Sequence, residues 1–158
     1  MKNPYIIVCL IVILAAGSYI IYNQLKSNEQ ASLLSGYNIS VHKTPTCGCC
    51  GEYVQYLKDQ GAKVTVVEHD NLTEERKVRH IPVMLESCHF SEIEGYVVEG
   101  HVPAEAIVKL LEERLEVAGI ALPDMPAGSP GMSGTKLSPF IIHQFTVEGG
   151  DNGIYMTL

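Results

Sequence analysis

The sequence predicts an α/β domain, a sheet flanked by helices, behind an N-terminal apolar helix. A short strand pattern, Ile39–His42, runs into a cysteine-rich turn, and an amphipathic helix pattern follows the turn as far as Gly61. Directly after that helix, Val64–Val67 is a second strand pattern made of β-branched residues. With 158 residues and 46% hydrophobic content, the chain is expected to form one modest globular domain preceded by a membrane segment.

The N-terminal segment is expected to anchor the chain in the inner membrane. Residues 5–22 form an uncharged, mostly apolar run that follows Lys2. A helix over this run rises roughly 27 Å at about 1.5 Å per residue, which is just enough for the core of a bilayer. Ala15–Gly17 offers a cleavage site, so a cleaved signal peptide is the alternative. The apolar run continues beyond that site through Ile20 and Ile21, which favours an uncleaved anchor.

Either alternative places the rest of the chain in an extracytoplasmic compartment such as the periplasm. The expected division is a signal anchor over residues 1–25, a polar linker over 26–36 and a domain over 37–158. The net charge of −7 and the absence of basic runs argue against a nucleic-acid partner.

The remaining elements follow from strand and helix patterns and from the proline and glycine residues between them. They are, in chain order, a short helix from Asn71 to Arg79, a strand after Ile81–Pro82, a strand at Gly95–His101, a helix from Pro103 to Gly119, an irregular loop over 121–134, and a C-terminal β-hairpin made of Phe140–Val147 and Ile154–Thr157.

The stretch Thr46–Gly51 is the candidate functional site, because three of its six residues are cysteines. Cys47 and Cys50 have the C-x-x-C spacing of dithiol redox proteins, and Cys49 adds a third sulfur between them. The turn lies where a strand meets a helix N-terminus, where the pKa of a thiol falls to roughly 3.5–7.5 from about 8.5. Thiolates bind metal ions or attack disulfides, so both functions remain open, and a purely structural disulfide would leave one sulfur unpaired.

The order of elements around this turn is that of thioredoxin-like proteins. A strand, the C-x-x-C turn, a helix, a strand, a second helix and an Ile-Pro pair before a further strand occur in the expected sequence. In such folds the proline is cis and faces the dithiol, so the Ile81–Pro82 bond is expected to be cis.

Four motifs in the same order resemble the CopG-type family of bacterial copper-resistance proteins. They are His42–Gly51, Ser87–His89, Gly95–Pro103 and Met125–Met132. The resemblance implies a thioredoxin-like fold, an extracytoplasmic location and copper bound by the cysteine motif, with a role in copper redox state or sequestration. Asp124 departs from the family pattern, in which a glycine is expected before the first loop methionine.

Residue chemistry agrees with copper, since thiolate and thioether groups are soft ligands that suit Cu(I), and clustered thiolates can bridge several ions. Cys88 is expected near the cysteines of the turn, because the strand after Ile81–Pro82 should lie beside them. Loop methionines often only cover apolar surface. The candidate metal ligands are Cys47, Cys49, Cys50, Cys88, His89, His101, Met125 and Met132, whereas His42, His69, His80 and His143 are predicted to be structural and Met84 to lie in the core.

Several alternatives remain at this point. Zinc is the rival metal, because three cysteines and a histidine form an ordinary structural zinc site. A thiol–disulfide oxidoreductase would use Cys47 and Cys50 as catalytic residues, with Cys88 or Cys49 as the resolving thiol. A membrane-tethered interaction module is a third possibility. The expected partners of a copper protein are copper ions and copper efflux or periplasmic copper-carrier proteins.

Overall fold

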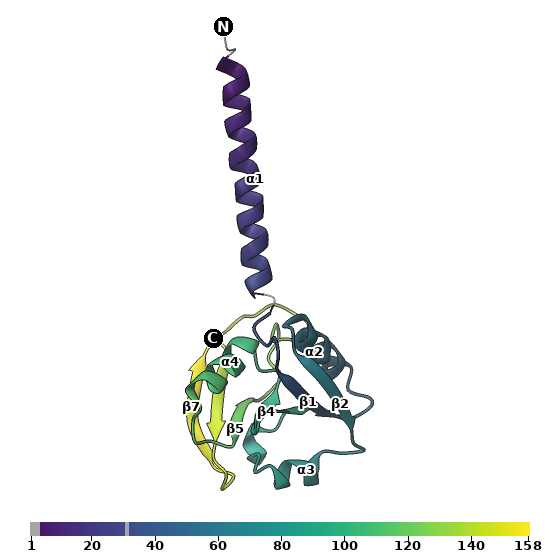
Figure 1. The fold of residues 1–158 in the computed structure, drawn as a ribbon. Coiled ribbons are helices and arrows are strands. Elements are labelled where there is room, and N and C mark those ends of the chain that lie inside the picture. Colours follow the sequence, from purple (N-terminus) through teal and green to yellow (C-terminus); the bar gives the residue numbers. More distant parts are fainter. Residues whose placement is uncertain (1–3, 31) are drawn as a thin grey trace.

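A computed structural model describes the backbone of residues 4–30 and 32–158 and the side chains of residues 10–23 and 32–158 (Figure 1). Its elements are, in chain order, α1 (Pro4–Gln30), β1 (Asn38–Lys43), α2 (Gly48–Asp59), β2 (Lys63–Glu68), α3 (Thr73–Val78), the 3₁₀ turn η1 (Val83–Leu85), β3 (Phe90–Ile93), β4 (Tyr96–Gly100), α4 (Ala104–Glu113), β5 (Gly119–Leu122), β6 (Ile141–Phe145) and β7 (Asp151–Thr157).

Helix α1 extends away from the domain, and the apolar side chains described along it are exposed (Figure 1). Among the described residues, no helix combines the length and the apolar character needed to cross a membrane. Lys2 lies outside the described residues, and the membrane anchor stays a prediction. The helix continues to Gln30, and Leu34, also in the predicted linker, is completely buried in the core.

The domain is built on a seven-stranded sheet with the strand order β2-β1-β3-β4-β5-β6-β7. Strand β1 pairs with β2 in parallel and with β3 in antiparallel, while β4 pairs with β5 in parallel. The predicted α/β sheet flanked by helices is therefore confirmed. The predicted C-terminal hairpin is also present, as β6 and β7, and it extends the sheet beyond β5.

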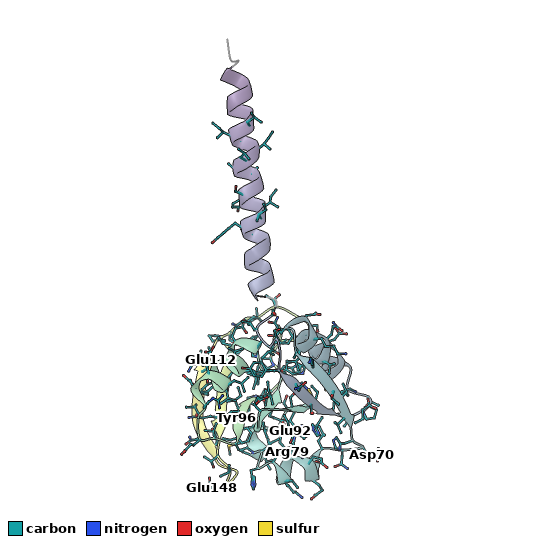
Figure 2. All side chains as sticks on the ribbon, in the orientation of Figure 1. Asp70, Arg79, Glu92, Tyr96, Glu112 and Glu148 are labelled. Carbon is teal, nitrogen blue, oxygen red and sulfur yellow. A yellow bond between two sulfur atoms is a disulfide. The ribbon has the colours of Figure 1, made fainter. Side chains whose placement is uncertain are left out.

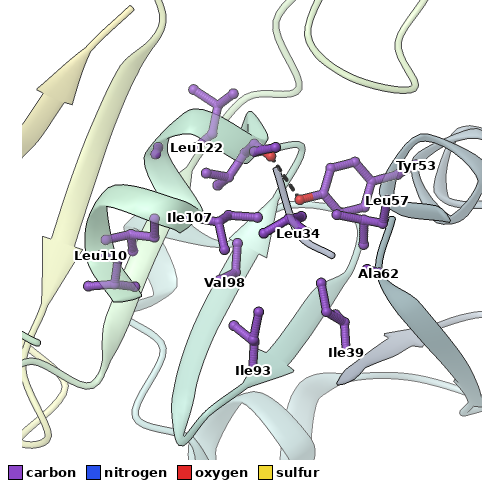
Figure 3. Packing of buried hydrophobic residues seen from close by; sticks show 14 of the residues in the cluster. Leu34, Ile39, Tyr53, Leu57, Ala62, Ile93, Val98, Ile107, Leu110 and Leu122 are labelled. Carbon is purple, nitrogen blue, oxygen red and sulfur yellow. Dashed lines mark hydrogen bonds between the residues drawn. The ribbon is translucent and has the colours of Figure 1, made fainter. Parts of the chain in front are cut away.

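The two faces of the sheet carry separate apolar clusters, because successive side chains of a strand point to opposite faces. Helices α2 and α4 pack on one face, where Tyr53, Leu57 and Ile107 meet strand residues such as Val98 (Figure 3). The hydroxyl of Tyr53 donates a hydrogen bond to the carbonyl of Val102 at 2.8 Å, which satisfies this polar group inside the core (Figure 3). The second face is covered in part by the segment around α3 and contains the cluster Leu72, Ile81, Leu85, Phe90, Val97, Ala121 and Phe145.

Two expectations from the sequence are wrong at Gly119 and after Pro82. The helix ends at Glu113, and Gly119 begins strand β5 instead of terminating the helix. A side chain at Gly119 would collide with the backbone carbonyl of Val97, so this glycine allows two strands to approach and is not a helix stop.

The residues after Pro82 form the turn η1 and not a strand, and the strand begins only at Phe90. Among the described residues no peptide bond is cis, so the expected cis bond at Ile81–Pro82 is trans. Met84, which was expected in the core, is 74% exposed on this turn.

A buried ion pair joins α3 to the sheet. The guanidinium of Arg76 donates two hydrogen bonds to one carboxylate oxygen of Glu99, at 2.9 and 3.2 Å, and one to the carbonyl of Ser87 at 2.7 Å. Both side chains are nearly inaccessible to solvent. Burial raises the pKa of Glu99 to about 7, and the charge of Arg76 opposes this rise. Removing one partner of such a pair leaves an uncompensated buried charge.

We predict that Arg76→Ala lowers the free energy of unfolding by about 3–5 kcal/mol, because it leaves Glu99 buried without its partner. The adjacent Lys77→Ala variant is the control, since its ion pair with Glu74 is exposed and is worth about 0.2–1 kcal/mol. Urea unfolding followed by circular dichroism measures both. Equal losses in the two variants would contradict the prediction.

Candidate metal centre

The three clustered cysteines surround the N-terminus of α2. Cys47 is the residue that precedes the helix, and Cys49 and Cys50 lie in its first turn. Cys47 and Cys50 form a disulfide, with 5.4 Å between their Cα atoms. Cys49 is a free thiol in the described part of the chain, and its Sγ lies 3.6 Å from Sγ of Cys47. The C-x-x-C pair is therefore oxidised in this structure and the third sulfur is free beside it.

Cys88 completes a group of four sulfurs. Its Sγ lies 3.8 Å from Sγ of Cys49, and its carbonyl oxygen lies 3.8 Å from Sγ of Cys50. One sulfur atom from each of the four cysteines lies within 4.8 Å of the others. The expected proximity of Cys88 to the turn is confirmed, even though the preceding residues form a turn and not the predicted strand.

The position of Cys88 is set by close contacts of its neighbour Ser87 with β4. The backbone N–H of Ser87 donates to the carboxylate of Glu99 at 2.5 Å. Gly100 lies against Ser87 so closely that a Cβ atom there would be 2.8 Å from the Ser87 side chain and 2.5 Å from the carbonyl oxygen of Leu122. The Arg76–Glu99 pair and Gly100 together fix the segment that carries Cys88.

Two buried histidines lie on the other side of Cys88. Nε2 of His101 is 3.1 Å from Sγ of Cys88, and Nδ1 of His89 is 3.3 Å from the same sulfur. Nδ1 of His101 is 2.6 Å from the carbonyl oxygen of Pro130, to which it donates its proton. This bond leaves the lone pair of His101 Nε2 directed at the sulfur, as in metal sites where a second hydrogen bond orients the imidazole.

His89 has one ring nitrogen beside Cys88 and one without a partner. Its Nε2 is buried and makes no hydrogen bond to any described residue. Burial lowers the pKa of His89 well below its usual value, with further contributions from His101 and Arg76. Burial also lowers the pKa of His101, against the effect of its bond to Pro130. Both imidazoles are therefore neutral at neutral pH, which is the state that binds metal ions.

The pKa of the Cys88 thiol is shifted upward, opposite to the downward shifts of the two histidines. Burial, followed by the charge and hydrogen bond of Cys49, raises its pKa to about 12. This differs from the lowered thiol pKa expected at the helix N-terminus, because Cys88 lies beside α2 in a buried segment and not on it.

The loop predicted over residues 121–134 begins only after Leu122, where β5 ends, and packs onto the cysteine turn. Gly131 has a left-handed φ of +78°, and a Cβ atom there would lie 2.6 Å from the backbone nitrogen of Tyr53 and 3.1 Å from the carbonyl oxygen of Cys49. Together with the bond from His101 to Pro130, this contact closes the loop over the two histidines.

The two loop methionines occupy different environments. Met132 is half-buried and lines an open cleft with Cys49, Glu52 and Gly131. Met125 is 39% exposed and is not among the residues that line this cleft. Asp124, where the family pattern has glycine, has a left-handed φ of 64°. Glycine adopts this conformation freely and aspartate at moderate cost, which explains why glycine is expected at this position.

The donor set fits a soft metal ion. Cys88 belongs to both groups of possible ligands, the four sulfurs and the set Cys88, His89 and His101. With Cys47 and Cys50 reduced, the centre would offer four thiolates beside two neutral imidazoles, and sulfur-rich sets of this kind suit Cu(I). The structure thus brings together six of the eight predicted ligands and places Met132 at their edge.

Several residues that build the centre were missed from the sequence. The ring of Tyr53 packs against those of both His89 and His101, tilted against the first and edge-on to the second, with ring centroids 4.6 and 5.4 Å apart. Pro130 contributes only a backbone carbonyl, and Glu99 acts through the backbone of a residue twelve positions earlier. Backbone contacts of this kind leave no side-chain pattern in the sequence.

Comparisons with known proteins agree with this geometry. Residues 85–132 match the family model described as "Protein of unknown function, DUF411". Two solved structures of a copper resistance protein CopG, form 1 and form 2, share 35% identity with the chain over 77% of its length. The match covers 96% and 98% of those chains, with TM-scores of 0.69 and 0.70. No curated protein matches the chain.

This match extends over nearly the whole length of both structures, at an identity of 35%. The chain therefore belongs to the CopG-type family of copper resistance proteins.

Proposed function

We propose that this protein binds copper as Cu(I) in a cluster of the thiolates of Cys47, Cys49, Cys50 and Cys88. The observation that carries the proposal is the place of Cys88, whose sulfur lies 3.8 Å from Cys49 on one side and 3.1 Å from His101 Nε2 on the other. A sulfur so placed can bridge ions held by the turn to ions held by the imidazoles, and thiolates commonly bridge several Cu(I) ions. His89, His101 and Met132 are the additional ligands in reach.

The disulfide supports a second step in which the dithiol changes the oxidation state of copper. Two Cu(II) ions each accept one electron from the dithiol of Cys47 and Cys50. The products are two Cu(I) ions and one S–S bond, and the two thiol protons are released. Cys49 and Cys88 remain free in the oxidised state, so soft ligands for Cu(I) are still present after the reaction.

Two alternatives are weaker on this geometry. With the disulfide reduced, the four sulfurs could also surround one tetrahedral zinc ion, but such a site gives no role to the imidazoles of His89 and His101 or to Met132. A general disulfide reductase is supported by the C-x-x-C pair and by the strand order β2-β1-β3-β4, which we assign to a thioredoxin-like arrangement. It gives no role to the two imidazoles beside Cys88.

We also propose an extracytoplasmic location, with residues 5–22 as the membrane anchor. Among the described side chains of helix α1, the large apolar ones, including Leu10–Leu14 and Ile20–Tyr22, are exposed. Copper efflux or periplasmic copper-carrier proteins are the expected partners for delivery or removal of the ion. The cleft beside Cys49 and Met132 is the side on which a carrier would reach the sulfurs.

The first test of the proposal is copper stoichiometry. The reduced chain, titrated with Cu(I) without oxygen, should bind more than one ion, and Cys88→Ser should lower that number without unfolding the domain. Thr46→Ser, an exposed neighbour of the turn, is the control and should leave the stoichiometry unchanged. Metal analysis after gel filtration gives the count. A wild-type chain that retains no copper, with full disulfide reductase activity in Cys49→Ser, would refute the proposal.

The redox step has its own test. When the reduced chain meets two equivalents of Cu(II) without oxygen, the Cu(II) signal in electron paramagnetic resonance should disappear while the thiol count falls by two. Cys50→Ser should slow the reaction at least tenfold because the pair can no longer close. Cys9→Ser, outside the centre, should react as the wild type does. Loss of the signal with no loss of thiols would disprove the step.

The location has a third test. The full chain should sediment with membranes and resist extraction with salt and carbonate if the uncharged run over residues 5–22 inserts as a helix, whose rise of roughly 27 Å is about the thickness of a bilayer core. Deletion of residues 2–25 should release the domain into the soluble fraction. Recovery of the full-length chain from a soluble extract, or a mature N-terminus at Ser18, would show that the segment is not an anchor.

A further inference from the structure

A second cluster of possible ligands lies on the other face of the sheet. His42 is next to Val41 in β1, and Val41 packs in the core with α2 whereas the ring of His42 stacks on Phe90 of the opposite cluster, with 4.5 Å between ring centroids. One ligand atom from each of His42, His69 and Glu75 lies within 4.8 Å of the other two. This group shares no residue with the cysteine centre.

The side chains of the cluster form a closed ring of contacts. His42 contacts Glu92 at 3.1 Å through Nε2 and His69 at 2.9 Å through Nδ1. Nδ1 of His69 lies 3.9 Å from a carboxylate oxygen of Glu75. Arg79 closes the ring, with hydrogen bonds to Glu92 at 2.7 Å and to Glu75 at 2.6 Å (Arg79 and Glu92 are labelled in Figure 2).

The ring fixes which nitrogen of His42 is available. The carboxylate of Glu92 accepts the proton of His42 Nε2, so the lone pair of Nδ1 is directed at His69. A carboxylate that holds the far nitrogen of a histidine is the usual support of a metal-binding imidazole. Burial lowers the pKa of His42, which keeps the ring neutral and able to bind a cation.

The facing nitrogens of His42 and His69 are nearly as far apart as two ligands of one metal ion. Nδ1 of His42 and Nε2 of His69 are 2.9 Å apart. Two imidazole nitrogens at about 2.0–2.1 Å from one ion are roughly 2.9 Å apart at adjacent corners of the tetragonal geometry typical of Cu(II), and roughly 3.3 Å apart around a tetrahedral ion, so their spacing needs to change by no more than a few tenths of an ångström. The proton between them would move to the far nitrogen of His69, which faces the carboxylate of Glu75.

The cluster is accessible from one side. The side chain of His42 is 7% exposed, whereas those of His69 and Glu75 are 20% and 37% exposed. An ion can therefore enter beside His69 and Glu75 and meet His42 at the inner end. Nitrogen and carboxylate oxygen ligands without sulfur suit divalent ions of the late first transition row, among which Cu(II) binds most tightly.

We propose that His42, His69 and Glu75 form a second metal site, which binds a divalent cation, with Cu(II) preferred over Zn(II). Glu92 and Arg79 are positioning residues that orient His42 and Glu75. The site does not depend on the cysteine centre, which takes soft monovalent copper through sulfur. His42 and His69, two of the four histidines predicted to be structural from the sequence, thereby gain a ligand role.

The test uses the full chain with Cys9→Ser, Cys49→Ser and Cys88→Ser, in which the Cys47–Cys50 disulfide leaves no free thiol. Titration with Cu(II) should give one bound equivalent, with two nitrogen ligands in electron paramagnetic resonance, and Zn(II) should compete weakly. His69→Gln and Glu75→Gln should each weaken binding at least tenfold, in line with losses at other metal sites. His143→Gln is the matched control, because His143 also contacts a carboxylate, that of Asp151, but lies outside the cluster.

Thermal unfolding of each variant separates loss of the site from loss of the fold, because Glu75 is partly exposed and its replacement should leave the domain folded. Absence of a stoichiometric Cu(II) site in the thiol-free chain would overturn the proposal. So would equal affinities in His69→Gln and His143→Gln. Binding that is lost in His101→Gln and kept in His69→Gln would place Cu(II) at the cysteine centre, and this result would overturn the second site while leaving the proposed function intact.

Discussion

The geometry of the centre depends on one buried carboxylate, that of Glu99. It accepts the backbone N–H of Ser87 and the guanidinium of Arg76, which itself donates to the carbonyl of Ser87. The backbone of Ser87 is therefore held from both its donor and its acceptor side by a pair inside the protein, and Cys88 is the next residue. The contacts of Cys88 with Cys49 and His101 require a defined position, and these bonds supply it.

Strand β1 connects the two groups of ligands. The chain leaves β1 after Lys43 and passes through Pro45 to reach Cys47. His42 lies five positions before Cys47, on the opposite face of the sheet. The sheet separates the sulfur-rich cysteine centre from the second cluster, whose possible ligand atoms are nitrogen and oxygen. The chemical difference matches the two common oxidation states of copper, since thiolates favour Cu(I) and imidazole with carboxylate suits Cu(II).

Much of the fold followed from the sequence because its signals are local. The strand–turn–helix around Cys47, the parallel strand β2 and the terminal hairpin all have periodic apolar patterns bounded by glycine or proline. The failures have non-local causes. Position 119 must be a glycine because the carbonyl of Val97 in another strand leaves no room for a side chain. The residues after Pro82 form a turn in place of the predicted strand, and β3 begins only at Phe90. The proximity of Cys88 followed from the order of elements, but its contact with His101 and the bond from Ser87 to Glu99 arise from tertiary packing alone.

The exposure of the four sulfurs has a kinetic consequence. Cys50 is completely buried, whereas Cys49 is half-buried and lines the cleft with Met132. On the proposed function, a copper carrier that approaches through the cleft would reach Cys49 before the buried Cys50, and the ion would first be shared between Cys49 and the carrier. Replacement of one ligand at a time toward Cys88 and His101 would then move the ion into the centre without full hydration.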